Sequence, residues 1–176
     1  MIETGLGDIN AHFKVYIANR PNFADFQTTP KLTPLGRGEL DAIGKACGNG
    51  WRKVFNVYAK VLFALNCEDL VSVQKATTWQ EFRDKYLLQA GSNTSLLFTP
   101  PQLSNDDIHI VMGKTYAKSL GLSLQWINDD FAIAPKAKLI VCPYFDYRQL
   151  SNIKIVTLVE LIRQQSGNHN KITKHL

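Results

Sequence analysis

The sequence predicts an α/β fold in which a mainly parallel, four-stranded sheet lies between two layers of helices. Three of the four short strand candidates are apolar throughout instead of alternating, which is typical of strands buried on both faces. Helical patterns are interspersed with these strands, as in proteins whose helices cover a parallel sheet. The chain has 176 residues, enough for one domain with a sizeable core. We therefore expect a single α/β domain over residues 1–165 and a flexible basic tail at 166–176.

The N-terminal half supplies one strand candidate and two helix candidates. Residues 13–18, FKVYIA, are rich in residues that favour strands. Thr33 and Pro34 suit the start of a helix, as a hydroxyl cap followed by a proline at the first helical position, and this helix would continue to about Cys47. The clearest helix lies at 51–66, because its apolar residues recur at spacings of three and four.

The C-terminal half alternates between strand and helix patterns. Thr78 and Glu81 fit a capping box at the start of a helix that Gly91 would end. Ser151 is placed to cap the final helix. The remaining candidates are strands at 95–101, 108–113 and 138–142 and a helix at 114–121.

One connection bears on whether neighbouring strands are parallel. Only residues 99–107 join the second and third strand candidates, and a segment of this length spans at most about 30 Å. Parallel neighbours usually need a connection of about a dozen residues or more. Either this connection lacks a helix or the two strands are antiparallel, and the sequence leaves both alternatives open.

Composition and charge limit the classes of function. The formal net charge is +5, which is compatible with a polyanionic partner such as nucleic acid. No apolar run approaches the roughly 20 residues of a membrane helix, so we expect no membrane association. The three cysteines lie in apolar contexts, which indicates reduced thiols in a cytoplasmic protein. No spacing of cysteines and histidines matches a zinc site, and we expect neither a metal nor a cofactor.

Four segments share the layout of a known family. VMGKTYAKSLG, residues 111–121, is similar to a strand, glycine, lysine and helix element, and LIVCPYFDYRQLSN, residues 139–152, is similar to a strand that leads into His-Pro-Ser and a helix. Residues 95–101 and 15–23 take the places of a middle strand and an early motif. In this order the chain resembles the uracil-DNA glycosylase superfamily, and as a whole it also looks like one of the uncharacterised bacterial families. The resemblance implies a parallel sheet flanked by helices and a nucleic-acid ancestry.

The departures from the glycosylase family fall on the residues that carry its chemistry. Arg20 stands where the family has the Asp or Asn that positions the attacking water, and a cation cannot act as a general base. Thr99 replaces the Asn that reads the flipped base, and Cys142 replaces the His that stabilises the leaving base. The resemblance therefore implies a glycosylase-like domain without standard uracil excision.

The expected ligand site lies at the C-terminal ends of the strands, where open α/β sheets bind their ligands. Tyr144 offers a ring for stacking on a base, and Lys114 and Arg148 offer cations for phosphate. In a purely structural role, Arg148 would instead pair with Asp146 or Glu160. We expect a nucleic acid or nucleotide as the ligand, and a non-catalytic module that binds a small molecule or a protein is the alternative. The candidate ligand-binding residues are Asn19, Arg20, Asn22, Thr99, Lys114, Cys142, Tyr144, Asp146 and Arg148.

A rival pattern is formed by Cys142 and Arg148, whose spacing is similar to the Cys-x5-Arg motif of cysteine-dependent phosphatases. That chemistry needs a thiolate of low pKa in a small, glycine-rich loop. Here Pro143 has no N–H group to offer a phosphate, and the carboxylate of Asp146 would repel it. The phosphatase is therefore the third hypothesis, and the substrate and the oligomeric state stay open.

Overall fold

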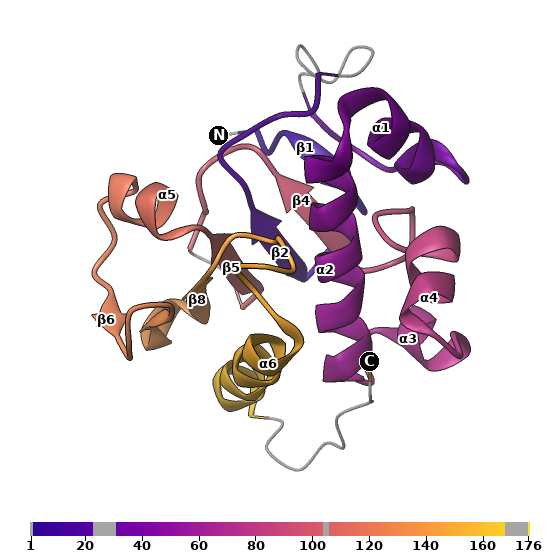
Figure 1. Ribbon diagram of the computed structural model, residues 1–176. Helices are drawn as coiled ribbons and strands as arrows, with labels where there is room; N and C mark the ends of the chain where they lie inside the picture. The colour runs from indigo at the N-terminus through magenta and orange to yellow at the C-terminus, as the bar shows by residue number, and fades with distance from the viewer. Residues whose placement is uncertain (1, 23–30, 104–105, 168–175) are drawn as a thin grey trace.

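The computed structural model describes residues 2–22, 31–103, 106–167 and 176, and it has an α/β architecture (Figure 1). The strands are β1 (Gly5–Gly7), β2 (Phe13–Tyr16), β3 (Leu32–Thr33), β4 (Thr94–Leu97), β5 (Ile108–Met112), β6 (Gln125–Trp126), β7 (Ala132–Ala134) and β8 (Leu139–Cys142). The α-helices are α1 (Glu39–Cys47), α2 (Asn49–Leu65), α3 (Val71–Lys75), α4 (Trp79–Lys85), α5 (Lys114–Ser119) and α6 (Asn152–Ser166).

The strands form a single mixed sheet in the order β3-β1-β4-β2-β5-β8-β7-β6. The four central strands, β4, β2, β5 and β8, are mutually parallel, and each overlaps one of the four segments that the sequence predicts as strands. On either side of them, β1 and β7 run antiparallel to β4 and β8. The prediction of a four-stranded sheet is therefore wrong, because the sheet has 8 strands. The four outer strands are only two or three residues long, too short to show an apolar pattern.

The strand order also explains the short connection at 99–107. β4 and β5 are not neighbours, since each pairs in parallel with a different edge of β2. The chain passes across β2 between them, and none of the described residues of this connection is helical. Of the two alternatives, the crossover without a helix is confirmed, and the antiparallel pair is wrong.

Each central strand contributes to two hydrophobic clusters, one on each face of the sheet. Val15, Ile110 and Ile140 belong to a first cluster that includes residues of α2 and α6. Their neighbours Tyr16 and Val111 belong to a second cluster that includes Ala117 of α5. We call these sides the first face and the second face. Helices therefore cover both faces, as continuous apolar strands predict.

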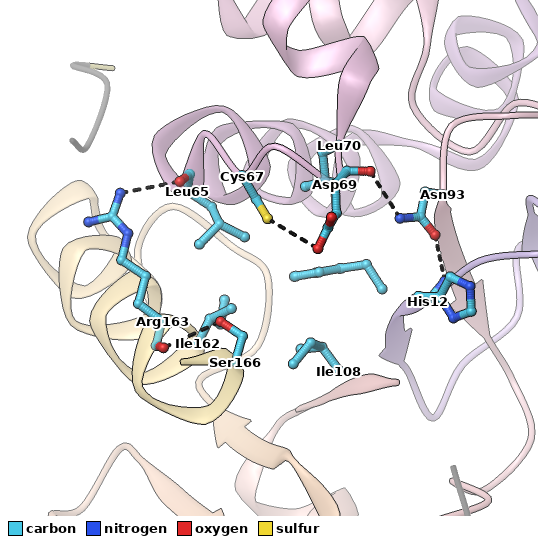
Figure 2. Close-up of a pocket in the computed structure, with 11 residues that line it drawn as sticks. His12, Leu65, Cys67, Asp69, Leu70, Asn93, Ile108, Ile162, Arg163 and Ser166 are labelled. Carbon is cyan, nitrogen blue, oxygen red and sulfur yellow. Dashed lines mark hydrogen bonds between the residues drawn. The ribbon is translucent and has the colours of Figure 1, made fainter. Parts of the chain in front are cut away.

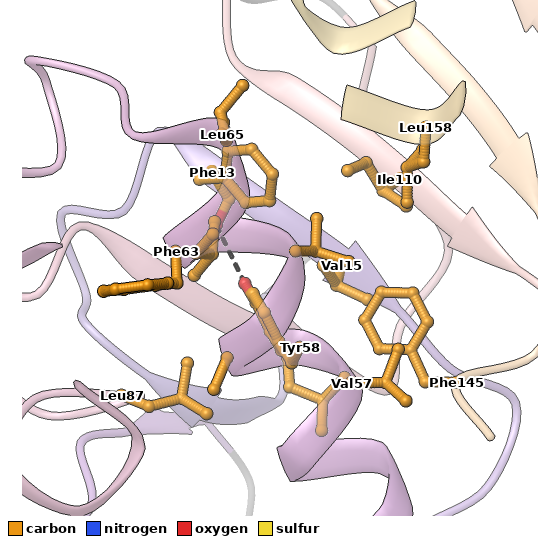
Figure 3. Packing of buried hydrophobic residues seen from close by; sticks show 14 of the residues in the cluster. Phe13, Val15, Val57, Tyr58, Phe63, Leu65, Leu87, Ile110, Phe145 and Leu158 are labelled. Atoms are coloured by element: carbon orange, nitrogen blue, oxygen red, sulfur yellow. Dashed lines mark hydrogen bonds between the residues drawn. The ribbon is translucent and has the colours of Figure 1, made fainter. Parts of the chain in front are cut away.

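Tyr58 of α2 joins the helix layer to the sheet on the first face (Figure 3). Its ring meets the ring of Phe145 edge-on, with the ring centroids 5.8 Å apart. Its hydroxyl donates a hydrogen bond of 2.8 Å to the backbone carbonyl of Ser95 in β4. The fully buried side chain thus adds a directional contact to the apolar packing of α2.

Two helix boundaries differ from the prediction for reasons that depend on distant segments. Thr33 lies in β3 and pairs with Leu6 of β1 instead of capping a helix, and α1 begins only after Gly38, at φ 84°. The helix that starts after Thr78 ends at Lys85 and not at Gly91. The buried residues that follow it turn towards β4, where the backbone N–H of Leu88 donates to the Thr94 hydroxyl.

The other two predicted hydroxyl caps, Thr78 and Ser151, are confirmed. The Thr78 hydroxyl accepts a hydrogen bond from the Glu81 backbone, and the Ser151 hydroxyl accepts one from the Lys154 backbone. The proposed tail at 166–176 falls mostly outside the described residues, and α6 extends to Ser166. Within the described ranges, no helix combines the length and the apolar content that a membrane span requires.

Candidate functional site

An open pocket of about 600 Å³ lies where three of the central parallel strands end. Ala18 follows β2, Met112 and Gly113 lie at the end of β5, and Tyr144 and Gln149 follow β8. We call it the strand-end pocket. Its position matches the general location of ligand sites in open α/β sheets.

Tyr144 lines this pocket and Asn19 does not, and the two residues follow two different strands, β8 and β2. Their side chains are hydrogen-bonded to each other. Burial raises the pKa of the Tyr144 hydroxyl, although the hydrogen bond with Asn19 acts in the opposite direction. At Gly113, φ is +98°, and an added Cβ would lie 4.0 Å from the Tyr144 ring. The pocket therefore contains an aromatic ring whose polar end is held by an amide.

Lys114 lines the same pocket from the start of α5. Its ammonium group donates a hydrogen bond of 3.2 Å to the backbone carbonyl of Asp129. It also lies 4.9 Å from the centre of the Trp126 ring, a distance at which a cation is attracted to an aromatic face. These two contacts hold an exposed positive charge on one wall of the pocket.

The loop after β8 turns sharply around Asp146. The backbone N–H of Asp146 donates to the carbonyl of Tyr144, and the carbonyl of Asp146 accepts from the N–H of Leu150. Its carboxylate accepts a hydrogen bond of 2.9 Å from the backbone N–H of Arg148. This hydrogen bond is the main cause that lowers the pKa of Asp146, and the nearby Lys53 and Arg148 side chains lower it further. Asp146 is therefore ionised at neutral pH and fixes the shape of the loop.

Three other candidates lie away from the strand-end pocket. The guanidinium of Arg20 lies 5.5 Å from the centre of the Phe98 ring. The Thr99 hydroxyl accepts a long hydrogen bond from the backbone of Thr4, and the backbone of Asn22 is hydrogen-bonded to the Cys47 thiol. None of the three candidates is among the described residues that line the pocket.

Cys142 faces the interior of the protein and not the pocket. Its side chain is completely buried in the cluster on the first face. Burial raises the pKa of the Cys142 thiol well above its usual value. A cysteine-dependent phosphatase needs the opposite, an accessible thiolate with a lowered pKa. The geometry around Cys142 therefore speaks against this chemistry.

Sequence reasoning missed several polar residues that line the pocket. They are Thr115, Tyr116 and Ser119 of α5 and Gln149, which follows β8. One feature of the sequence could have indicated these residues: the predicted helix at 114–121 directly follows a predicted strand and so begins at the strand ends. Which of its residues would face the loop after β8 depends on how the two segments pack.

A second concentration of polar groups lies on the second face, around Lys14 of β2. The Lys14 ammonium is 3.1 Å from a Glu3 carboxylate oxygen and 3.0 Å from an Asp107 carboxylate oxygen. The other oxygen of Asp107 is 2.7 Å from Nδ1 of His12. We call Glu3, His12, Lys14 and Asp107 the Lys14 network. Burial would lower the pKa of Lys14, but its bonds to Asp107 and Glu3 outweigh burial and raise the pKa.

A buried pair of rings lies next to this network. The Tyr16 hydroxyl and Nδ1 of His109 are 2.7 Å apart, and both side chains are almost completely buried. Burial lowers the pKa of His109 to about 4. His109 is therefore neutral at physiological pH, and the Tyr16–His109 pair contributes a hydrogen bond without an additional charge.

The small cavity near the start of β2 and β5 is a poor candidate for a ligand site (Figure 2). Its volume is about 60 Å³, space for only a few water molecules. The polar groups in its wall bond to one another, since Asn93 accepts from the His12 backbone and donates to the Asp69 carbonyl. The strand-end pocket, which is about 600 Å³, is large enough for a nucleotide-sized ligand.

The described residues contain no group of three or more histidine, cysteine or acidic side chains that is placed to hold a metal ion. No curated protein and no solved structure matches the chain significantly. A family model, described as "Family of unknown function (DUF6942)", matches residues 4–163. Because this match covers most of the chain, the chain belongs to that family of unknown function.

Proposed function

We propose that the strand-end pocket binds a nucleotide, either free or as part of a nucleic acid. The observation that carries this proposal is that Lys114 and Tyr144 meet in the pocket wall at the strand ends, with Asn19 hydrogen-bonded to Tyr144. These residues supply an amide, a cation and an aromatic ring. A nucleotide has a partner for each of them, namely the base edge, the phosphate and the face of the base.

The interactions that these residues can make support a nucleotide as the ligand. Stacking of a base on an aromatic side chain contributes about 1–3 kcal/mol and tolerates any base, because every base has an aromatic face. The amide of Gln149 in the pocket wall can both donate and accept hydrogen bonds. The net charge of +5 favours the approach of a polyanion.

We also propose a distant relationship to the uracil-DNA glycosylase superfamily, without its standard excision reaction. The relationship is supported by the central parallel strands, which carry the four resembling segments in the same chain order. Arg20, Thr99 and Cys142 stand at the positions that carry the family's chemistry, and Cys142 is buried. We expect a uracil-containing oligonucleotide to bind without release of uracil.

Binding of a labelled single-stranded DNA oligonucleotide, followed by fluorescence anisotropy, tests the proposal. We expect affinity to fall as salt rises from about 50 to about 200 mM, because phosphate contacts release counterions. Tyr144→Ala and Lys114→Ala should each weaken binding, with Lys136→Ala as the control for loss of one surface cation. Absence of binding at the lowest salt, or equal binding by all variants, would refute the proposal.

A non-catalytic module that binds a small molecule is the second candidate. It is favoured by the composition of the pocket wall, where no described lining residue is acidic, a histidine or a cysteine. These are the side chains that most often act as general bases, and the Thr115 and Ser119 hydroxyls in the wall have none of them among the described lining residues to activate them. A small neutral metabolite that displaces the labelled oligonucleotide, with no dependence on salt, would favour this candidate.

We further propose a cytoplasmic location. The three cysteines are thiols and not disulfides, and Cys142 is fully buried. Cytoplasmic redox systems keep thiols in this state. Localisation of a tagged full-length chain by cell fractionation tests this proposal, which fails if the protein is recovered outside the cytoplasmic fraction.

A further inference from the structure

An exposed aromatic residue, Tyr147, follows the pocket residue Tyr144 by three positions. Tyr147 is 55% exposed and belongs to neither hydrophobic cluster. The Lys53 ammonium lies 5.3 Å from the centre of its ring, and the Arg148 guanidinium lies 5.7 Å from it. An exposed ring between two cations presents both a stacking surface and positive charge.

The charges around this ring leave a net positive value. The Asp146 carboxylate lies 3.6 Å from Lys53 and 3.6 Å from Arg148. One carboxylate against two cations leaves a local charge of +1. Arg148 is the more adjustable cation, since 67% of its side chain is exposed, whereas the Lys53 side chain is 21% exposed. Its guanidinium can therefore leave the ring and contact a phosphate or stack on a base.

The ring is close enough to the pocket for one strand of nucleic acid to reach both. Tyr147 is three positions after Tyr144, so their Cα atoms are at most about 11 Å apart. Stacked nucleotides of one strand are about 3.4 Å apart and separate further when the strand is extended. The turn around Asp146 fixes this part of the loop through backbone hydrogen bonds. A free mononucleotide in the pocket has no second base for Tyr147.

We propose that Tyr147, Lys53 and Arg148 form a second nucleotide subsite, so that the preferred ligand is a single-stranded nucleic acid of at least two nucleotides. This inference rests on the proposed function of the strand-end pocket. One base occupies the pocket at Tyr144, and its neighbour stacks on Tyr147. Lys53 and Arg148 neutralise the phosphates between and beside them.

Probes of one, two and four nucleotides distinguish binding at the pocket from binding at the second subsite. The probes are thymidine 5′-monophosphate and the thymidine dinucleotide and tetranucleotide, titrated into the full chain and followed by NMR. For the unmodified protein, we expect the dinucleotide to bind at least about fivefold more tightly than the mononucleotide, which is the gain from one stacked base. Equal affinity for the two probes would overturn the second subsite while leaving the pocket in place.

Substitutions test whether Tyr147 is responsible for the higher affinity for the dinucleotide. Tyr147→Ala should remove the advantage of the dinucleotide and leave the affinity for the mononucleotide unchanged, whereas Tyr144→Ala should weaken both. Ile153→Ala, which alters another exposed apolar side chain, is the control. If Tyr147→Ala leaves the length dependence intact, the inference is wrong. If the unmodified protein binds none of the probes, the proposed function fails as well.

Asp146→Asn tests the role of charge. Asparagine retains the oxygen that accepts from the Arg148 backbone, while the local charge rises from +1 to +2. We expect tighter binding of the tetranucleotide and a steeper salt dependence, by about 0.7 in the slope of the logarithmic plot for each additional phosphate neutralised. Unchanged or weaker binding would contradict a phosphate contact at this subsite.

Discussion

The Lys14 network and the strand-end pocket are two polar regions of the same sheet, and they use their charges in opposite ways. Around Lys14, the ammonium group lies within 3.1 Å of each of two carboxylates, and the Lys14 side chain is only 10% exposed. At the strand ends, Lys114 and Arg148 are exposed and have only long contacts or backbone partners. In the Lys14 network the charged groups pair with one another, whereas the cations at the strand-end pocket are exposed to solvent.

The physical reason for this difference is burial. Removing a charge from water costs several kcal/mol unless a partner of opposite charge compensates it. The buried Lys14 cation is therefore compensated by the Glu3 and Asp107 carboxylates, whereas the exposed cations of the pocket can exchange water for phosphate. Charged groups within one fold thus indicate a binding site only where they remain accessible.

The largest expected effect comes from breaking the Lys14 network. Lys14→Met should lower the free energy of unfolding by about 3 kcal/mol, because it leaves the Glu3 and Asp107 carboxylates without their shared cation. Urea denaturation measures the change. Lys45→Met is the matched control, since Lys45 pairs with Asp41 on the surface and its loss should cost under about 1 kcal/mol. Equal effects of the two substitutions would show that the network is not a buried ionic centre.

The next effect is a loss of stability at mildly acidic pH. The folded protein holds the pKa of His109 at about 4, below its usual value of 6.5. The unfolded chain therefore binds more protons between these values, and stability is lost as the pH falls from about 6.5 towards 4. We expect a decrease of about 2 kcal/mol in the free energy of unfolding.

Urea denaturation across this pH range measures the decrease. His109→Gln should flatten the pH dependence of the free energy of unfolding between about pH 6.5 and 4.5, because it removes the titrating imidazole from the second face. A slope that persists in this variant would assign the effect to another residue. Asp107 adds a separate loss below pH 3.8, because its pKa is lowered in the fold.

A pair of tyrosine substitutions compares the two regions directly. Tyr16→Phe removes the buried hydroxyl that bonds His109 and should cost about 1 kcal/mol. Tyr144→Phe removes a half-buried hydroxyl at the pocket, where water can replace it as the partner of Asn19, and should cost only a few tenths of a kcal/mol. Thermal unfolding resolves the difference. A larger cost at Tyr144 would mean that the pocket is built for stability.

The smallest effect on stability is expected at Lys114. Lys114→Ala removes a cation–ring contact and one exposed hydrogen bond to a carbonyl, which together should contribute under about 1 kcal/mol. Urea denaturation should therefore give nearly the same midpoint as the unmodified protein. A large loss of stability would assign Lys114 a structural role and make its binding variant uninformative.

Local patterns in the sequence were sufficient to locate the central elements. All four parallel strands and α2 lie where apolar runs or helical periodicity predict them, and Thr78 and Ser151 cap their helices as expected. These features depend on neighbouring residues, so they can be seen without knowledge of the fold. Of the candidate site, only the general position at the strand ends and the pair of Lys114 and Tyr144 in the pocket wall could be anticipated.

Tertiary structure decided the features that require distant segments to meet. The pairing of β3 with β1 moved the start of α1 from Thr33 to Glu39. The placement of β2 between β4 and β5 separated Thr99 from Tyr144, because the two follow strands that are not neighbours. Lys14 and His109, two polar interruptions in apolar strands, became buried because partners from other segments compensate them.

The sequence by itself therefore determined the α/β class, the central parallel strands and the long helix, since periodicity and capping are properties of contiguous residues. It did not determine the outer strands, the order of the strands or the membership of the pocket. Those depend on the free energy of contacts between segments that lie far apart in the chain, such as the bond between Asn19 and Tyr144. No local pattern carries that information.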